Sequence, residues 1–307
     1  MKKVLVATQK PFAPAAVELI RDVVKKSGYE FHLFEKYAEQ ADLVNAVKGM
    51  DALIIRSDKV TEEVIGAADQ LKIVIRAGAG YDNVDLAAAT AKDVTVMNTP
   101  GQNSNAVAEL AFGMMVYLAR KNFGGSAGTE LRGKKIGIHA FGNVGQYVAL
   151  IAKGFGMDVY AFDPFVSKES IEKAGVTPLE SVEELYSTCQ YVSLHIPAND
   201  QTKKSIGMDL LGSMPKGAVL VNTARKEVIH EEELIELMAK RTDFGYISDI
   251  APDCAAEIAE KYEGRYFFTP KKMGAQTAEA NINAGIAAAE QIRDFFEKGD
   301  VTYKVNK

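Results

Sequence analysis

Short apolar segments alternate with amphipathic segments along almost the whole chain, and this alternation limits the possible folds more than any other feature. The apolar segments are rich in β-branched residues and bounded by Gly, Asp, Asn or Pro, which is typical of buried strands. They are Val4–Thr8, Phe31–Phe34, Ala52–Ile55, Ile73–Ile75, Val94–Met97, Lys135–His139, Val159–Phe162, Tyr191–Ile196, Ala218–Val221, Phe244–Ile250 and Tyr266–Thr269. Helical patterns lie between them at Ala15–Lys26, Leu43–Lys48, Glu62–Ala68, Val144–Gly154 and Glu231–Ala239. Such alternation predicts an α/β protein with parallel sheets and helices on both faces.

The alternation is interrupted in the middle of the chain, and this break indicates two domains. A chain of 307 residues is long for one core, since single cores rarely exceed roughly 250–300 residues. Apolar helical stretches at Asn105–Ala119 and Ala278–Phe296 frame the second half. We therefore predict a discontinuous first domain, residues 1–99 plus 281–307, with residues 100–280 inserted as a second domain.

Composition excludes several classes of protein. The formal net charge of −5 argues against a non-specific nucleic-acid binder, which would carry a basic footprint. The two cysteines do not make a disulfide framework in a chain of this length. The first apolar run is too short for a signal peptide, and no stretch approaches the length of about 20 residues that spans a bilayer. We expect a cytoplasmic protein with no nucleic-acid, membrane or metal partner.

A nucleotide-binding signal follows the strand Lys135–His139. The segment Phe141-Gly142-Asn143-Val144-Gly145 runs into a helical pattern, and Ala140 takes the place of the first glycine of a G-x-G-x-x-G fingerprint. Gly142 would let the backbone approach a pyrophosphate, and Gly145 would let the helix pack on the strand. The free N–H groups of Asn143 and Val144 would face the phosphates. An ordinary strand–turn–helix with two glycines is the alternative.

Asp163 strengthens the nucleotide interpretation. It ends the next strand, about 20 residues after the glycines, where an acid holds the adenosine ribose hydroxyls. Pro164 and Phe165 follow, with no cation to accept a 2′-phosphate, which favours NAD over NADP. An aspartate that only caps its own turn is the alternative.

Several further segments occur in the order found in one known family. They are Arg76–Asp85, Asn98–Gly101, Val107–Glu109, His195–Pro197 and Val221–Arg225. With them the chain resembles the D-2-hydroxyacid dehydrogenase family over its whole length. At Ile55–Lys59 and Asn222–Glu227 it most resembles the short phosphoglycerate dehydrogenases of that family.

The resemblance implies an architecture. Two Rossmann-like domains are expected, with the NAD-binding domain at residues 100–280 and the substrate-binding domain at residues 1–99 plus 281–307. It also implies a homodimer through the helix Asn105–Ala119, although core packing would explain the apolar pattern of that helix equally well.

The resemblance also implies roles for individual residues. Arg225 matches the arginine that clamps the substrate carboxylate and polarises the C2 oxygen, with an exposed strand-end arginine as the alternative. Asp249 matches the acid that holds the nicotinamide carboxamide. His195 matches a residue that lines the cofactor cleft, and a structural histidine is the equal alternative. The remaining implied contacts are the backbone N–H groups of Ala77, Gly78 and Ala79 toward the carboxylate, and Ile196, Pro197, Thr223, Ala224 and Gly274 toward the cofactor.

The chain departs from the family at two positions. Lys271 stands where the family has its acid/base histidine, and Cys254 stands where it has the partner glutamate. A lysine side chain has an ordinary pKa near 10.4. Nearby cations and desolvation lower such a pKa, whereas a carboxylate raises it, so losing the glutamate together with the histidine is coherent. We therefore expect Lys271 to handle the proton, with Arg225 and Lys272 as neighbouring cations.

Three points about these departures stay open. A dead enzyme that kept its cofactor site is an alternative reading. Either Lys271 or Lys272 could face the substrate, although the alignment to Pro270 favours Lys271. Cys254 is interpreted as a small buried filler rather than a thiol nucleophile.

The substrate is expected to be a small anionic 2-hydroxy acid. Arg56, Ser57 and Lys59 follow the strand Ala52–Ile55, and two cations there suit a phosphate, with a solvated surface pair as the alternative. This favours oxidation of D-3-phosphoglycerate to 3-phosphohydroxypyruvate, the first step of serine synthesis. The alternatives are another D-2-hydroxyacid dehydrogenase, such as a hydroxypyruvate or glyoxylate reductase, and a non-catalytic NAD-sensing protein.

Overall fold

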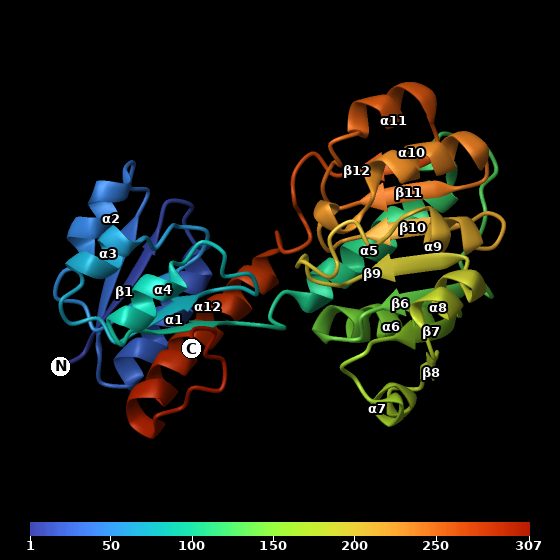
Figure 1. The fold of residues 1–307 in the computed structure, drawn as a ribbon. Coiled ribbons are helices and arrows are strands. Elements are labelled where there is room, and N and C mark those ends of the chain that lie inside the picture. Colours follow the sequence, from blue (N-terminus) through green and yellow to red (C-terminus); the bar gives the residue numbers. More distant parts are fainter. The chain divides into compact units, whose positions relative to one another are not determined.

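The structure is a computed structural model that describes residues 1–307, and parallel strands alternate with helices along it (Figure 1). The strands are β1 Lys3–Thr8, β2 Glu30–Glu35, β3 Ala52–Ile55, β4 Ile73–Arg76, β5 Thr95–Asn98, β6 Lys135–His139, β7 Asp158–Phe162, β8 Thr177–Pro178, β9 Tyr191–Leu194, β10 Val219–Asn222, β11 Gly245–Ser248 and β12 Tyr266–Phe268. The α-helices are α1 Pro14–Lys26, α2 Gln40–Ala46, α3 Glu62–Ala67, α4 Leu86–Ala91, α5 Ser104–Ala119, α6 Asn143–Gly154, α7 Lys168–Lys173, α8 Val182–Thr188, α9 Met208–Ser213, α10 Glu231–Lys240, α11 Ala255–Lys261 and α12 Ala278–Lys298. Short 3₁₀ turns lie at Lys121–Phe123 and Lys226–Val228.

The predicted α/β alternation is confirmed, and every predicted strand is present with its ends shifted by no more than a few residues. The sequence patterns missed β8 and the helices α4, α7, α8, α9 and α11. Each of these helices has only six or seven residues. At 3.6 residues per turn, so short a helix barely repeats its apolar face, and only α2 and α3 among the helices of this length were predicted.

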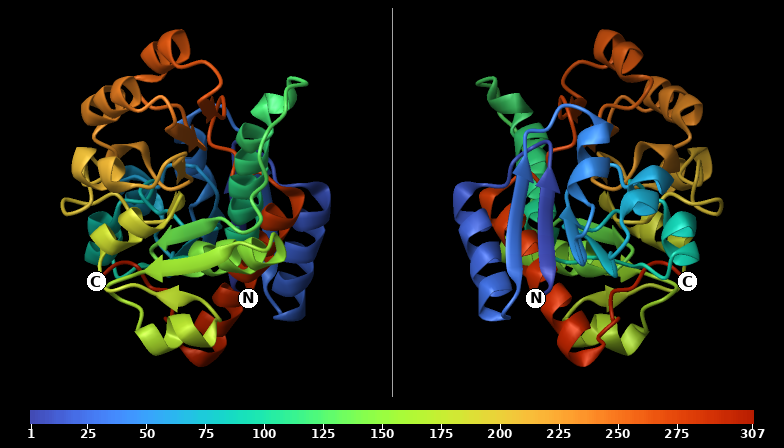
Figure 2. Two further views of the ribbon diagram at one scale, coloured as in Figure 1. Left: turned by 90° about the vertical axis from the view of Figure 1, so that its right-hand side faces the viewer. Right: turned by 90° about the vertical axis from the view of Figure 1, so that its left-hand side faces the viewer.

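The first compact unit comprises Met1–Asn103 and Thr277–Lys307. Its five parallel strands have the order β2-β1-β3-β4-β5. Helices α1 and α12 contribute to one apolar cluster against the sheet, and α2, α3 and α4 contribute to another, so helices cover both faces (Figure 2). The strand order reverses between β1 and β3, and the loops after such strands are the usual ligand-binding positions of an open α/β sheet.

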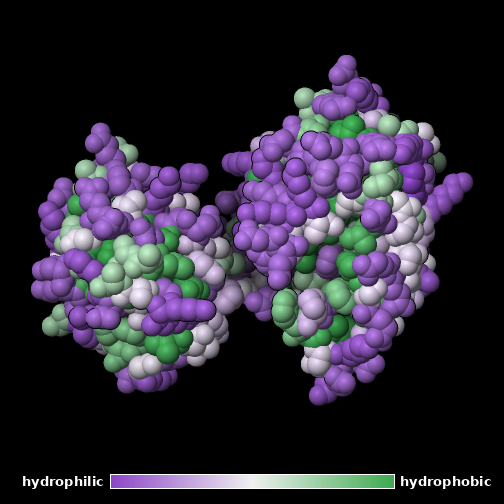
Figure 3. Space-filling view, viewed as in Figure 1, coloured by the Kyte–Doolittle hydropathy of each residue, from purple (hydrophilic) through white to green (hydrophobic).

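The second compact unit comprises Ser104–Gln276. Its seven parallel strands have the order β12-β11-β10-β9-β6-β7-β8. Helices α5 and α6 pack with one apolar cluster, and α8 to α11 pack with another. The order reverses between β6 and β9, which makes the carboxyl ends of these strands the expected ligand crevice. Hydrophilic residues cover much of the visible face of each unit (Figure 3).

The chain passes from one unit to the other at Asn103/Ser104 and again at Gln276/Thr277. The boundaries expected from the sequence, 99/100 and 280/281, lie within a few residues of these crossings. The whole of α5 belongs to the inserted unit, while α12 packs on α1 in the first unit. The roles assigned to the two domains on the basis of the sequence remain predictions.

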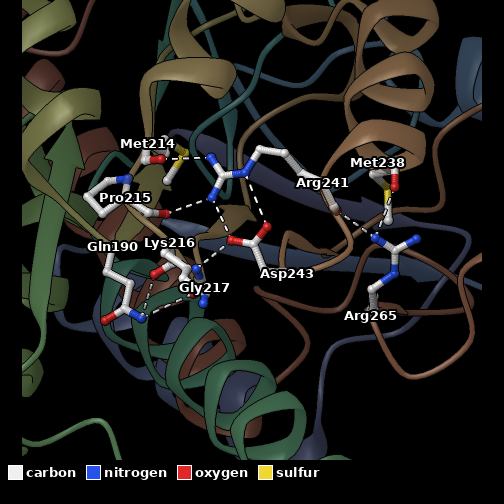
Figure 4. Close-up of polar contacts among 9 residues, drawn as sticks. All are labelled: Gln190, Met214, Pro215, Lys216, Gly217, Met238, Arg241, Asp243 and Arg265. Carbon is white, nitrogen blue, oxygen red and sulfur yellow. Dashed lines mark hydrogen bonds and ion pairs between the residues drawn. The ribbon is translucent and has the colours of Figure 1, made fainter.

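A polar cluster ties together the loops at the amino ends of β9 to β12 (Figure 4). Arg241 donates to the carbonyl oxygens of Met214 and Pro215 at 2.7 and 2.8 Å and to Asp243 Oδ2 at 2.7 Å. Asp243 also accepts from the Gly217 N–H at 2.7 Å. The Arg241 guanidinium and this N–H hold the pKa of the Asp243 carboxyl well below its usual range. The cluster therefore stabilises the sheet edge opposite to the expected crevice.

Replacing Arg241 with alanine is expected to lower the free energy of unfolding by about 2–3 kcal/mol, because two carbonyl groups and a carboxylate lose their donor. Asp243 has a depressed pKa in the folded state, so its stabilising contribution is present above the pKa of the unfolded chain and is lost as the pH falls below it. Urea denaturation across acidic pH measures both effects. Lys240→Ala is the matched control, because Lys240 pairs only with the exposed Glu236 and should cost under about 1 kcal/mol. Equal losses in the two variants would contradict the prediction.

Candidate active site

The candidate cofactor residues of the second unit all follow strand ends at one edge of its sheet. The loops that carry them come directly after β6, β7, β9, β10, β11 and β12. Because parallel strands end at a common edge, these loops are neighbours in the order given by the sheet. The arrangement matches the crevice at a topological switch point.

The loop after β6 has the geometry of a phosphate-binding turn. A Cβ added to Gly145 would lie 2.4 Å from the carbonyl oxygen of Ala140, so only glycine fits there. Ala140, at the first-glycine position, adopts a left-handed φ of 79°. Helix α6 begins at Asn143, and the N–H groups of Asn143 and Val144 find no acceptor in the chain. These free donors and the helix dipole suit a pyrophosphate.

Asp163 joins the turn after β7 to the phosphate-binding turn. Its Oδ2 accepts from the Phe141 N–H at 2.8 Å, and its Oδ1 accepts from the Phe165 N–H at 2.8 Å. Asp163 thus caps its own turn, as the alternative reading held. Each carboxylate oxygen can still accept a second hydrogen bond, so the residue also fits the ribose hydroxyls.

Two histidines lie beneath this crevice. His195 Nε2 is 3.0 Å from Ser193 Oγ, and its Nδ1 is 3.5 Å from Thr223 Oγ1. His139 Nδ1 is 3.3 Å from the hydroxyl of the fully buried Tyr186. Burial lowers the pKa of His139 to about 4 and that of His195 to about 3. Both rings are therefore neutral near pH 7, and the contacts of His195 support the structural reading of that residue.

These two pKa values predict acid sensitivity. The unfolded chain takes up protons on both histidines near pH 6.5, whereas the folded chain does so only below about pH 4. Stability should therefore fall as the pH falls from 6.5, by about 2 kcal/mol per histidine at pH 5. In His139→Phe the dependence of unfolding free energy on pH should be roughly halved, whatever the variant's stability at neutral pH. Identical pH slopes in the two proteins would refute this assignment.

The loop after β10 presents Arg225 at the same edge. Asn222 Oδ1 accepts from the Ala224 N–H at 3.0 Å, and its Nδ2 donates to the Arg225 carbonyl at 2.9 Å, which fixes the loop. Arg225 is exposed, and its Nη1 donates to the Ala224 carbonyl at 2.9 Å. It pairs with no carboxylate, so its guanidinium is available to an anion. The supporting role of Asn222 was not foreseen, because its contacts depend on the turn geometry.

The side chain of Asp249 fixes the conformation of the lysine loop, residues 269–274. The carboxylate is buried, and it accepts from the Thr269 hydroxyl at 3.0 Å and from the N–H groups of Met273 and Gly274, each at 2.7 Å. Asp249 therefore positions the lysine loop in this structure, in addition to any contact with a nicotinamide. Lys271 and Lys272 are both exposed. The Nζ of Lys272 reaches the carbonyl oxygen of Ala224 at 3.4 Å.

In the first unit, Arg56 follows β3 and is partly committed to internal contacts. Its Nη1 donates to the carbonyls of Lys10 and Pro11 at 3.2 and 3.1 Å, and its Nη2 hydrogen-bonds to Asn281. Burial lowers the pKa of the Arg56 guanidinium. Ser57 and Lys59 are exposed in the same loop. Arg56 therefore keeps some, but not all, of its donors for a ligand.

Asp58 organises this loop, a function that the sequence did not reveal. Its Oδ1 accepts from the Gln9 N–H and from the Tyr37 hydroxyl, each at 2.7 Å, and its Oδ2 accepts from the Arg56 N–H at 3.2 Å. It is 5% exposed, although most aspartates lie at the surface. Its partners are distant in sequence, which explains why no local signal identified it.

The backbone N–H groups expected to bind the substrate carboxylate lie in the loop after β4, and one of them is not available. The Ala77 N–H donates to the Ile55 carbonyl at 2.8 Å in the sheet, so it is not free to bind a carboxylate. The N–H groups of Gly78 and Ala79 have no acceptor in the chain and remain candidates. Gly78 has a φ of 144°, and the Arg76 guanidinium fills the space that a Cβ would need.

Comparisons with known proteins decide the family. Residues 117–259 match the sequence profile of the D-isomer specific 2-hydroxyacid dehydrogenase NAD binding domain. The hydroxypyruvate reductase of Thermotoga maritima is 34% identical over 284 residues, which cover 86% of this chain and 90% of that protein. This chain belongs to the D-isomer specific 2-hydroxyacid dehydrogenase family. The resemblance inferred from the sequence motifs is confirmed, and so is NAD as the cofactor.

Two further members of the family are informative. The crystal structure of NAD⁺-bound 3-phosphoglycerate dehydrogenase from Entamoeba histolytica has a TM-score of 0.87 and 46% identity, over 100% of this chain and 99% of that one. The D-3-phosphoglycerate dehydrogenase of Synechocystis sp. is 36% identical over 273 residues, covering 83% of this chain but 48% of that protein. The chain thus spans about half the length of such relatives. None of its helices is long and apolar enough to cross a membrane.

Cys254, at the position of the family's glutamate, is not the buried filler that the sequence suggested. It is only partly buried and lines a cavity of about 820 Å³. Burial and the neighbouring carboxylate of Glu231 raise the pKa of its thiol to about 12, so it stays protonated at neutral pH and is a poor nucleophile. Glu231 also accepts from the N–H groups of Asp253 and Cys254, at 3.0 and 2.8 Å, and so fixes the loop after β11.

Proposed function

We propose that this family member oxidises D-3-phosphoglycerate to 3-phosphohydroxypyruvate with NAD, as the first step of serine synthesis. The observation that carries the proposal is the meeting of the Arg225 loop and the lysine loop at one sheet edge, where Lys272 reaches the Ala224 carbonyl. An arginine without a carboxylate partner beside two exposed lysines suits an anionic substrate. The names of relatives at 46% and 36% identity support the phosphorylated acid as the substrate.

Each catalytic group has a distinct proposed task. Arg225 binds the substrate carboxylate and polarises the C2 oxygen. Lys271 accepts the proton of the C2 hydroxyl, in place of the family's histidine. The N–H groups of Gly78 and Ala79 bind the second carboxylate oxygen. The nicotinamide of NAD, when bound, supplies the hydride acceptor.

The cofactor is proposed to bind along the edge that Figure 1 shows at the ends of β6, β7, β9, β10 and β11. Asp163 would hold the ribose hydroxyls, and the first turn of α6 would hold the pyrophosphate. The further proposed contacts are Phe141, Gly142, Asn143, Val144, Gly145, His195, Ile196, Pro197, Thr223, Ala224, Asp249 and Gly274.

The phosphate end of the substrate is assigned to Arg56, Ser57 and Lys59. We expect Lys59→Ala and Arg56→Ala each to raise the KM for D-3-phosphoglycerate by about 10-fold or more, because each loses a charged hydrogen bond to phosphate. The KM for D-glycerate, which lacks the phosphate, should change little in Lys59→Ala. Lys48→Ala is the control, since Lys48 follows α2 away from this loop and donates only to Asn45. An unchanged KM for D-3-phosphoglycerate in both variants would exclude this phosphate site.

The Thermotoga relative, named a hydroxypyruvate reductase, favours a second candidate substrate. A substrate panel of D-3-phosphoglycerate, D-glycerate, hydroxypyruvate and glyoxylate separates the two candidates by their kcat/KM values. NAD binding without turnover of any of them would instead indicate a sensor. We also propose that the protein forms a homodimer through α5. The mass of the protein in solution tests whether a dimer forms.

A further inference from the structure

The imidazole of His139 is a buried group that the proposed reaction does not use. His139 is the last residue of β6, directly before the phosphate-binding turn, and it is 9% exposed. Its ring stands perpendicular to that of Tyr186 on α8, with 5.8 Å between the ring centroids, and the ring centroid of Phe162 is 6.4 Å away. Strand β6 pairs with β7 on one side and with β9 on the other. The imidazole therefore lies at the carboxyl edge of the sheet, between the ends of these two strands.

Only one of the two ring nitrogens of His139 has a partner in the chain. Because burial lowers the pKa of His139 to about 4, the ring is neutral near pH 7 and carries one N–H group. Its Nδ1 is 3.3 Å from the hydroxyl of Tyr186, which is fully buried and has no other hydrogen-bond partner. A buried hydroxyl hydrogen without an acceptor is costly, so the hydroxyl donates to Nδ1. This hydrogen bond assigns the ring proton to Nε2.

The Nε2–H group of His139 is a donor without an acceptor in the chain. It is not enclosed by protein, in contrast to Nδ1 of His230, which is buried and unpartnered. Tyr186 and Phe162 cover the ring on the side of α8, so Nε2 is reached from the carboxyl edge. Burial lowers the pKa of His139, and the carboxylate of Asp163, which follows β7 at this edge, opposes that shift. The donor is therefore close to the residue proposed to hold the adenosine ribose.

We propose that His139 is a cofactor-binding residue whose Nε2–H donates to a hydroxyl oxygen of the adenosine ribose of NAD. A ribose hydroxyl can both donate and accept, whereas a carboxylate can only accept. Asp163 therefore takes the hydrogen of the ribose hydroxyls, and His139 supplies the donor that their oxygens need. An aliphatic side chain at position 139 would leave such an oxygen without this donor. The inference rests on the proposed position of the cofactor, but not on the identity of the substrate.

ADP-ribose tests the contact without any turnover, because it carries the adenosine half of NAD and lacks the nicotinamide. Calorimetric titration of ADP-ribose into the full chain should show binding about 5-fold or more weaker in His139→Leu than in the parent, because a buried hydroxyl loses its donor. His139→Phe, which also has no donor but keeps a ring, gives the same comparison if the leucine variant does not fold. His32→Leu is the control, since His32 lies on β2 in the first unit. Its affinity for ADP-ribose should stay within about 2-fold of the parent.

Deoxy analogues test which atom accepts the hydrogen bond. The affinities of ADP, 2′-deoxy-ADP and 3′-deoxy-ADP are compared in the parent and in His139→Leu. For one of the two analogues, the loss of affinity on removing the hydroxyl should be about 3-fold or more smaller in the variant, because the variant no longer donates to that oxygen. A merely structural role of His139 would weaken all three nucleotides equally and leave these ratios unchanged.

Several results would overturn the proposal. They are an ADP-ribose affinity of His139→Leu within about 2-fold of the parent, an equal loss in His32→Leu, and no binding of ADP-ribose by the parent protein. Unchanged ratios for both deoxy analogues would also overturn it, since the ribose hydroxyls would then not be the acceptors.

The proposed position of the cofactor can fail separately from this inference. If Asp163→Ala and His139→Leu both bind ADP-ribose as the parent does, the nucleotide does not lie at this edge, and both proposals fail. If Asp163→Ala weakens binding but His139→Leu does not, only the role of His139 fails. Neither result depends on which 2-hydroxy acid the protein oxidises.

Discussion

Lys271→Met is expected to lower kcat for the oxidation of D-3-phosphoglycerate by about 10²–10⁴-fold, the usual contribution of a general acid or base. Methionine keeps an unbranched side chain of about the length of the lysine's aliphatic stem and removes the proton acceptor. The KM should change little, because the carboxylate and phosphate contacts are assigned to other residues. Steady-state kinetics on the purified protein measure both constants.

A second substitution separates proton transfer from simple charge. Arginine keeps the positive charge at this position but cannot be deprotonated in a protein. Lys271→Arg should therefore be as impaired as Lys271→Met. A kcat near the parental value in Lys271→Arg would show that the residue acts only as a cation. A kcat near the parental value in Lys271→Met would show that Lys271 takes no part in the reaction.

Arg225→Gln is expected to lower kcat/KM by about 10³-fold, because a charged hydrogen-bonding pair with the substrate carboxylate is typically worth 2–5 kcal/mol. The loop itself should survive, since Asn222 holds it through backbone groups rather than through the guanidinium. Lys226→Gln removes the same charge one residue further along the chain and should keep kcat/KM within about 3-fold. Comparable losses in the two variants would mean that the effect is a general one of local charge.

Much of the architecture could be predicted because its signals are local. Short apolar strands bounded by turn residues identify the sheets, and the spacing of Gly142, Gly145 and Asp163 predicts where a nucleotide binds. Five of the seven helices that have only six or seven residues escaped detection, since their patterns are too brief to repeat. Helices α5 and α12 are long enough for their apolar patterns to be recognised. The domain boundaries predicted from them therefore lie within a few residues of the two points where the chain passes between the units.

The supporting contacts of the candidate site could not be predicted, because they join residues far apart in sequence. Asp58 reaches Gln9 and Tyr37, and Glu231 reaches the loop of Cys254. The hydrogen bond of the Ala77 N–H to the Ile55 carbonyl could not be predicted from the motif either, because it depends on the register of β3 and β4. The motif order identified the loops, and the tertiary fold determined which groups remain free.

The central claim is that this chain moves a hydride from C2 of a 2-hydroxy acid to NAD. The most direct test is to incubate the protein with D-3-phosphoglycerate deuterated at C2 and NAD, and to measure the mass of the reduced cofactor. We predict that the NADH formed carries the deuterium, and that Lys271→Met forms labelled NADH about 10²–10⁴-fold more slowly than the parent. Unlabelled NADH, or bound NAD that is never reduced by this or any other 2-hydroxy acid of the panel, would contradict it.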